Sequence, residues 1–143
     1  MSTDNWLLTY GMLSAYCLAG GLMEHFAVFS GWKAVSSGQF RSVQTAQGHG
    51  SGAVYVLPQF ALTAVVISLL VVAPDGIPAW PLWAGLSALA VWWIVFAVQL
   101  PIQLRIRQNA DRDALERLLR IDWIRVAAIA VNFGCVIVAV ASN

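Results

Sequence analysis

Ionisable side chains stand at the ends of the chain's apolar segments, where they could perform acid–base chemistry. Glu24 and His25 close the first apolar segment, and His49 precedes the second. Asp122 and Arg125 open the fourth, three residues apart, which places them on one helical face. Desolvation favours the neutral form of a carboxyl group, so Glu24 is a candidate general acid or base. A histidine would be the complementary group, and these five residues form the candidate catalytic set.

A second set of side chains is suited to binding a substrate. In the second and third apolar segments, amide and aromatic residues recur at helical spacing, which places the members from each segment on one face. The amides would orient a carbonyl or hydroxyl group, and the rings would flank an apolar body. The set consists of Tyr55, Gln59, Trp92, Phe96, Gln99 and Gln103.

Each candidate also has a purely structural interpretation. A carboxylate in a bilayer needs a partner, so Glu24 could simply pair with Arg125 or Arg105. Glutamines between membrane helices commonly hold the helices together. Asp122 and Arg125 could be an ion pair at the start of a helix.

The elements that position these residues are four apolar runs, at about residues 6–29, 52–73, 80–104 and 121–141. The composition is 59% hydrophobic and only 10% charged, unlike that of a soluble domain. Each run is near the ~20 residues that a helix needs to cross a bilayer. The sequence therefore predicts an all-α integral membrane four-helix bundle, with residues 1–143 forming a single transmembrane domain.

The basic residues predict an orientation for this bundle. Lys33 and Arg41 lie between the first and second runs, and the other six basic residues lie between Gln99 and Arg125. The first and third loops share a side in a four-span chain, so the positive-inside rule places both in the cytoplasm. Both termini are expected outside.

Four local features are expected along the chain. Pro58 should bend the second helix and free a backbone carbonyl, and Pro101 should make the end of the third irregular. The glycine-rich residues 48–52 should be flexible. Asn109 or Asp111 should cap a short amphipathic helix before the fourth span. The apolar side of that helix is Leu115, Leu118 and Leu119.

The third loop and its flanks resemble a known family. Gln99-x-Pro101-x-Gln103, a charged linker with Leu118 and Leu119, and Asp122-Trp123-x-Arg125 are similar to small bacterial four-helix membrane proteins of the anthrone-oxygenase-like family. The chain has Gln103 where a histidine is usual, and Glu24-His25 in place of a Gln and Tyr-Pro pattern. The resemblance implies a compact bundle in a bacterial inner (cytoplasmic) membrane and a lipophilic, aromatic or polyketide-like substrate.

These observations favour a multi-pass membrane enzyme that acts on a lipophilic small molecule at a cytoplasm-facing pocket. Isomerisation, cyclisation or oxygenation without a cofactor fits best, since motifs for nucleotides, metals and acyl transfer are missing. One alternative is a non-catalytic accessory or assembly subunit of a membrane complex. Another is an electron-transfer protein with haem between His25 and His49. The expected partners are membrane lipids, the substrate and a second copy or membrane complex, without nucleic acid.

Overall fold

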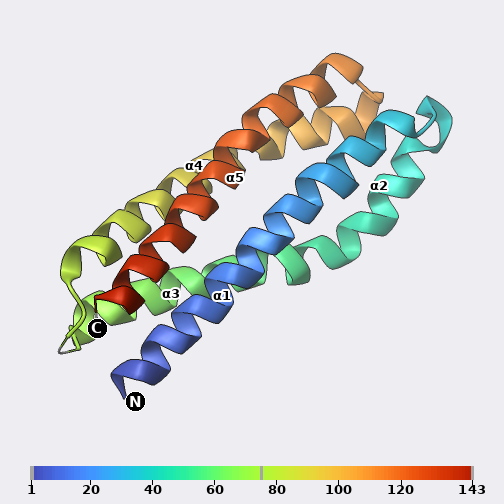
Figure 1. Ribbon diagram of the computed structural model, residues 1–143. Helices are drawn as coiled ribbons and strands as arrows, with labels where there is room; N and C mark the ends of the chain where they lie inside the picture. The colour runs from blue at the N-terminus through green and yellow to red at the C-terminus, as the bar shows by residue number, and fades with distance from the viewer. Residues whose placement is uncertain (1, 75, 143) are drawn as a thin grey trace.

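The computed structural model of the protein describes residues 2–74 and 76–142, apart from the side chains of residues 37, 48, 49 and 51. The described chain is helical, with short connections and no strand (Figure 1). Its elements are α1 (Thr3–Met23), η1 (Glu24–Phe29), η2 (Trp32–Ala34), α2 (Ser37–Ser51), η3 (Gly52–Val56), α3 (Leu57–Val72), α4 (Ala79–Asn109) and α5 (Arg112–Ala141). Two of these, η1 and η3, are π-helical, and η2 is a 3-10 turn. The predicted all-α class is confirmed.

Four helical stretches in the described chain are long and apolar enough to cross a membrane. They are Thr3–Ala34, Gly52–Val72, Ala79–Asn109 and Arg112–Ala141. Gly52–Val72 matches the second predicted run to within one residue, and each of the other three stretches contains one predicted run. Three of the stretches have 30 residues or more, which exceeds the ~20 that the hydrocarbon core requires. These helices therefore extend past the apolar layer, and their extensions carry the polar sequence.

The helices place the termini and connections at two ends of the bundle. Both termini lie at one end with the connection between α3 and α4, which we call the terminal end (Figure 1). The connections from α1 to α2 and from α4 to α5 lie at the opposite end, which we call the hairpin end (Figure 1). Lys33 and Arg41 lie around the first of these connections, and the other six basic residues, up to Arg125, lie around the second. The hairpin end is therefore the basic end.

The core toward the terminal end contains a neutral network of hydrogen bonds. The amide of Asn132 accepts a bond from Ser14 Oγ at 2.8 Å. Its Nδ2 donates to Tyr10 Oη at 3.1 Å and to the Gly85 carbonyl at 3.2 Å. Ser14, Asn132 and Tyr10 are fully buried. The network joins α1, α4 and α5 and satisfies the polar atoms that an apolar core would otherwise penalise.

The hairpin end differs from the sequence prediction in its connections. The amphipathic segment expected as a separate helix is the beginning of α5, and Asp111 caps it by accepting from the Ala114 N–H at 3.0 Å. Only Ala110 and Asp111 separate α4 from α5, with Ala110 in the left-handed region at φ 49°. The chain continues as one helix because its three leucines pack against residues of α4, η1, η2 and α2. That cluster is Leu115, Leu118, Leu119, Ile102, Ile106, Phe29, Trp32 and Phe40.

The backbone of residues 48–52 is helical, so the expected flexible segment was wrong. A helix satisfies its own backbone groups, and this outweighs the conformational freedom of three glycines. The helix therefore continues without a gap from α2 through η3 into α3.

The two helical prolines behave differently. Pro58 follows the π-helical η3, and the Val54 carbonyl four residues earlier accepts a bond from Tyr16 Oη at 3.2 Å. The predicted disruption and freed carbonyl are therefore confirmed. Pro101, by contrast, lies inside an unbroken α4, so the predicted irregular end was wrong. Pro101 is exposed, and Ile102 and Ile106 beyond it are buried, so packing maintains the helix.

Candidate functional site

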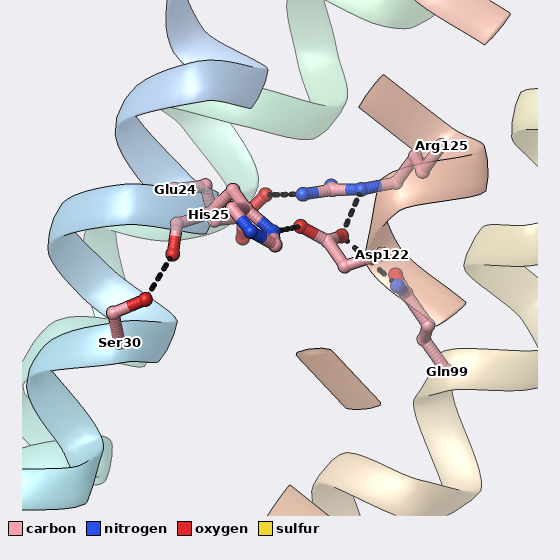
Figure 2. Close-up of polar contacts among 6 residues, drawn as sticks. All are labelled: Glu24, His25, Ser30, Gln99, Asp122 and Arg125. Atoms are coloured by element: carbon pink, nitrogen blue, oxygen red, sulfur yellow. Dashed lines mark hydrogen bonds and ion pairs between the residues drawn. The ribbon is translucent and has the colours of Figure 1, made fainter. Parts of the chain in front are cut away.

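A charged network crosses the bundle interior between η1 and α5 (Figure 2). At its centre, Asp122 Oδ1 accepts from Arg125 Nε at 2.7 Å and from Gln99 Nε2 at 2.9 Å. Asp122 Oδ2 lies 2.8 Å from His25 Nδ1. The Arg125 guanidinium also forms an ion pair with Glu24, 2.5 Å between Nη2 and Oε2. These five residues form the charged network, and each is at most 8% exposed.

The π-helical turn at the end of α1 explains how two adjacent residues both face inward. Successive residues of an α-helix are 100° apart, so Glu24 and His25 would lie on opposite margins of the buried face. In η1 the i→i+5 bonding widens the turn, and Glu24, His25 and Phe29 are all buried. On α5, Asp122 and Arg125 share a face through their three-residue spacing. Gln99 reaches Asp122 from α4, which packs extensively on α5.

The partners within the network are unevenly distributed. Asp122 has three partners, whereas Glu24 Oε2 and Arg125 Nη2 have only each other among the described residues. Two carboxyl groups share one guanidinium, and the His25 ring contacts the carboxyl group that has the most partners.

An apolar cavity of about 380 Å³ adjoins the Glu24–Arg125 side of the network. This volume is within the range of sites that hold drug-sized ligands. Its apolar wall is formed by Val28, Phe29, Val56, Phe96, Leu100 and Leu104. Leu100 and Leu104 are about half exposed on the outer side of α4, so the cavity reaches the surface that contacts lipid in a membrane-spanning bundle.

Polar groups gather on one side of this cavity. Tyr55, Gln103, Gln44 and Gln47 line it together with Glu24 and Arg125. Gln44 Nε2 donates to the Gln103 carbonyl at 3.4 Å, and its buried Oε1 has no partner among the described residues. A buried acceptor without a donor is costly, so a ligand hydroxyl or N–H placed there would be stabilised.

The structure brings most of the sequence candidates together, but in different positions relative to the cavity. Of the catalytic set, Glu24 and Arg125 line the cavity, whereas His25 and Asp122 lie behind them. The His49 side chain lies outside the described residues.

The substrate-binding candidates divide in the same way. Tyr55, Phe96 and Gln103 line the cavity. Gln59 and Trp92 line a neighbouring space of about 10 Å³, which Glu24, Tyr55 and Arg125 also border. Gln99 is fully buried against Asp122. The Trp92 and Phe96 rings stack at 5.3 Å, and the Arg125 guanidinium lies 5.7 Å from the Trp92 ring centre.

Several residues that form or support the site were not predicted from the sequence. Gln44 and Gln47 belong to α2, a polar helix in which only His49 was a candidate from the sequence. Trp32, which donates to Gln47 at 2.6 Å, follows the first apolar run. Arg112 donates to three carbonyls at the end of the first helix, those of Trp32 (3.2 Å), Lys33 (2.9 Å) and Val35 (2.6 Å). The cluster of glutamines between residues 39 and 47 was the available signal for this wall.

Among the described residues, no three histidine, cysteine, aspartate or glutamate side chains form a group that could hold a metal ion. No family model, curated protein or solved structure matches the chain.

Proposed function

We propose that this protein is a multi-pass membrane enzyme that acts on a lipophilic small molecule by cofactor-independent acid–base chemistry. The observation that carries the proposal is the position of the Glu24–Arg125 ion pair. It forms part of the wall of an apolar cavity whose other polar groups include a buried acceptor without a partner. Structural ion pairs gain nothing from an adjacent cavity, whereas a reactive carboxylate requires one.

In the proposed reaction, Glu24 is the general base. Pairing with Arg125 favours the carboxylate form and opposes the desolvation that favours the neutral acid, and the cavity brings an acidic C–H or O–H group of the substrate to Glu24. Arg125 and the side-chain amide of Gln103 would stabilise the negative charge that develops on the substrate, while Gln44 Oε1 would accept a hydrogen bond from a substrate hydroxyl or N–H. Asp122 holds Arg125 from behind, and His25 in turn holds Asp122. Isomerisation, cyclisation and oxygenation of a phenolic carbanion all begin with such a proton abstraction.

The substrate would enter from the bilayer. The cavity is bordered by exposed Leu100 and Leu104 of α4 and by Gly52 of η3, so its edge lies on the lipid-facing surface. A flat aromatic body would fit between Phe96 and the aliphatic residues, with its polar end at Glu24.

A photoreactive probe tests this site without knowledge of the substrate. A long-chain alkylphenol that carries a diazirine is incorporated with the protein into proteoliposomes, and the labelled peptides are mapped by mass spectrometry. Labelling should concentrate in residues 28–56 and 96–107. Equal labelling of the open apolar groove between α1 and α5 at the terminal end, lined by Leu7, Met12 and Phe133, would contradict the proposal.

A matched pair of glycine substitutions sharpens the experiment. Gly52 lines the cavity, and a Cβ atom at that position meets nothing within 4 Å. Gly52→Phe should therefore reduce labelling by filling the entrance. Gly50 offers similar space but does not line the cavity, so Gly50→Phe should label like the wild type.

The second candidate is a non-catalytic accessory subunit, and the Glu24–Arg125 pair itself favours it because the pair ties η1 to α5. In that case the pair stabilises the fold, and its loss lowers the melting temperature. Haem ligation by His25 and His49 stays a prediction, because the His49 side chain lies outside the described residues.

We also propose the orientation and location that the charge pattern predicts, a bacterial inner membrane with the hairpin end in the cytoplasm. In a variant without Cys17 and Cys135, a cysteine introduced at Ser2 should react with an impermeant reagent applied outside the cell. A cysteine introduced at Arg117 should react only after the membrane is opened. External labelling at position 117 would reverse the orientation.

A further inference from the structure

A second concave site lies on the other side of the charged network, at the outer surface between the end of α1 and the beginning of α5. Its volume is about 300 Å³, and we call it the outer groove. His25 and Trp123 form its inner part, and Ser30, Lys33, Glu116 and Arg120 surround it, together with Leu119. None of these residues except His25 belongs to the charged network, so the outer groove is distinct from the cavity beside Glu24.

The histidine is the informative residue in this groove. Its Nδ1 lies against Asp122 Oδ2 at 2.8 Å, so the Nδ1 proton is donated to the carboxylate. The residue is only 5% exposed, and its Nε2, on the opposite edge of the ring, has no partner among the described residues. Nε2 accepts a hydrogen bond when the imidazole is neutral and donates one when it is protonated. A ligand with hydroxyl groups and anionic oxygens can therefore satisfy it in either state.

The charges around the groove select an anion. Lys33 has no acidic partner among the described residues, and Arg120 is paired only with Glu116, at 3.6 Å with both side chains largely exposed. Exposed pairs of this kind contribute little, so the Arg120 guanidinium is available to a ligand. Two cations against one carboxylate leave the groove with a positive excess at its mouth.

The other edge of the groove is aromatic. Trp123 is 50% exposed and Phe26 is 59% exposed, and their ring centres lie 5.6 Å apart. Tryptophan at the junction of an apolar span and a charged segment is typical of the membrane interface, where its ring lies at the level of the headgroups. The groove therefore joins a cationic part to an apolar part along the direction in which a lipid would lie.

We propose that the outer groove binds an anionic phospholipid whose headgroup carries hydroxyl groups, such as a phosphatidylglycerol. Lys33 and Arg120 contact the phosphate, His25 Nε2 contacts the headgroup, and the acyl chains follow Phe26 and Trp123. Because His25 also holds Asp122, the lipid occupies a position directly behind the charged network. This site is independent of the reaction proposed above, and it persists if the protein is an accessory subunit.

Native mass spectrometry of delipidated protein in detergent tests the proposal, with phosphatidylglycerol and phosphatidylcholine of identical chains as probes. Wild-type protein should retain one phosphatidylglycerol in preference to phosphatidylcholine. Lys33→Gln with Arg120→Gln should weaken phosphatidylglycerol binding roughly thirtyfold, as expected for two interfacial cations. The matched control, Arg105→Gln with Arg117→Gln, removes two exposed cations that do not line the groove and should bind like the wild type. Equal weakening in both variants would overturn the specific site.

A variant of opposite sign covers the case in which the double substitution fails to fold. Glu116→Gln removes, at an exposed position, the only carboxylate among the described residues that line the groove, so phosphatidylglycerol binding should tighten. Asp113→Gln is the control, because Asp113 is exposed on the same helical turn and does not line the groove. Unchanged binding in Glu116→Gln would contradict the proposal. Competition by inorganic phosphate at the same concentration as the lipid would show a free-anion site and would also overturn it.

Discussion

The bundle contains two buried polar networks that join the same helices and differ in almost every other respect. The neutral network of Tyr10, Ser14 and Asn132 is uncharged, and the amide of Asn132 uses both its oxygen and its nitrogen. It belongs to regular α-helices and lines none of the cavities described above. The charged network is bordered by π-helical segments and lies between a cavity and an open groove.

The difference separates what holds the bundle together from what contacts other molecules. A network that only joins helices gains by satisfying every atom and excluding space. At the hairpin end, Gln44 Oε1, Gln59 Nε2 and Gln99 Oε1 are buried and have no partner in the described part of the chain, and π-helical turns are common at functional sites. Unsatisfied polar atoms and π-helical turns destabilise the fold, and proteins retain them where a ligand or a reaction needs them.

The largest effect should come from the centre of the charged network. Asp122→Asn replaces a fully buried carboxylate, which pairs with Arg125 and has three partners, by a neutral amide. We expect a loss of about 3 kcal/mol or more, the range for breaking a buried ion pair. Thermal unfolding in detergent measures it, with exposed Asp113→Asn as the control. A melting temperature like that of the wild type would show that the network does not stabilise the fold.

The next comparison replaces one buried amide in each region by leucine. Asn132→Leu leaves Ser14 Oγ, Tyr10 Oη and the Gly85 carbonyl without a partner, which should cost about 2 kcal/mol or more. Gln59→Leu removes an amide whose nitrogen has no partner among the described residues, so stability should change little. Denaturation of the two variants side by side gives the answer. Equal losses would remove the distinction between the two regions.

A smaller effect is expected where α1 and α4 approach closely in the neutral region. A Cβ atom at Gly85 would lie 2.5 Å from Tyr10 Oη and 3.0 Å from Asn132 Nδ2. Gly85→Ala should therefore cost about 1–2 kcal/mol through overpacking. Tyr10→Phe removes the nearest atom, so the double variant should lose less than the sum of the two single variants. If the losses of the two single variants simply add, the strain in Gly85→Ala does not come from the contact with Tyr10 Oη.

Much of this arrangement follows from the sequence, and the remainder has physical reasons. The positions of Glu24, Gln99 and Asp122 at the ends of apolar runs predicted where polar groups meet. Periodicity does not reveal a π-helical turn, because it depends on which side chains the neighbouring helices admit. Periodicity also did not indicate that α2 forms a wall of the cavity, because most of its residues are polar. Phe40 packs α2 against Trp32, with 5.7 Å between the ring centres.

The two carboxylates of the charged network, Asp122 and Glu24, have different surroundings and contribute differently to stability. Asp122 is fully buried and has three partners, whereas Glu24 lines the cavity and pairs only with Arg125 among the residues that the structure describes. If Glu24 is neutralised, Arg125 keeps Asp122 as a counter-ion at 2.7 Å. Neutralising Glu24 should therefore cost much less stability than neutralising Asp122.

The most direct measurement determines unfolding and probe labelling on one preparation of Glu24→Gln in proteoliposomes. The melting temperature should stay within a few degrees of the wild-type value, since a loss of about 1 kcal/mol shifts it by roughly 4 °C or less in a chain of this size. Labelling of residues 28–56 and 96–107 by the diazirine alkylphenol should fall at least severalfold. A melting temperature as low as that of Asp122→Asn, restored by adding Arg125→Gln and accompanied by unchanged labelling, would show that Glu24 only supports the fold.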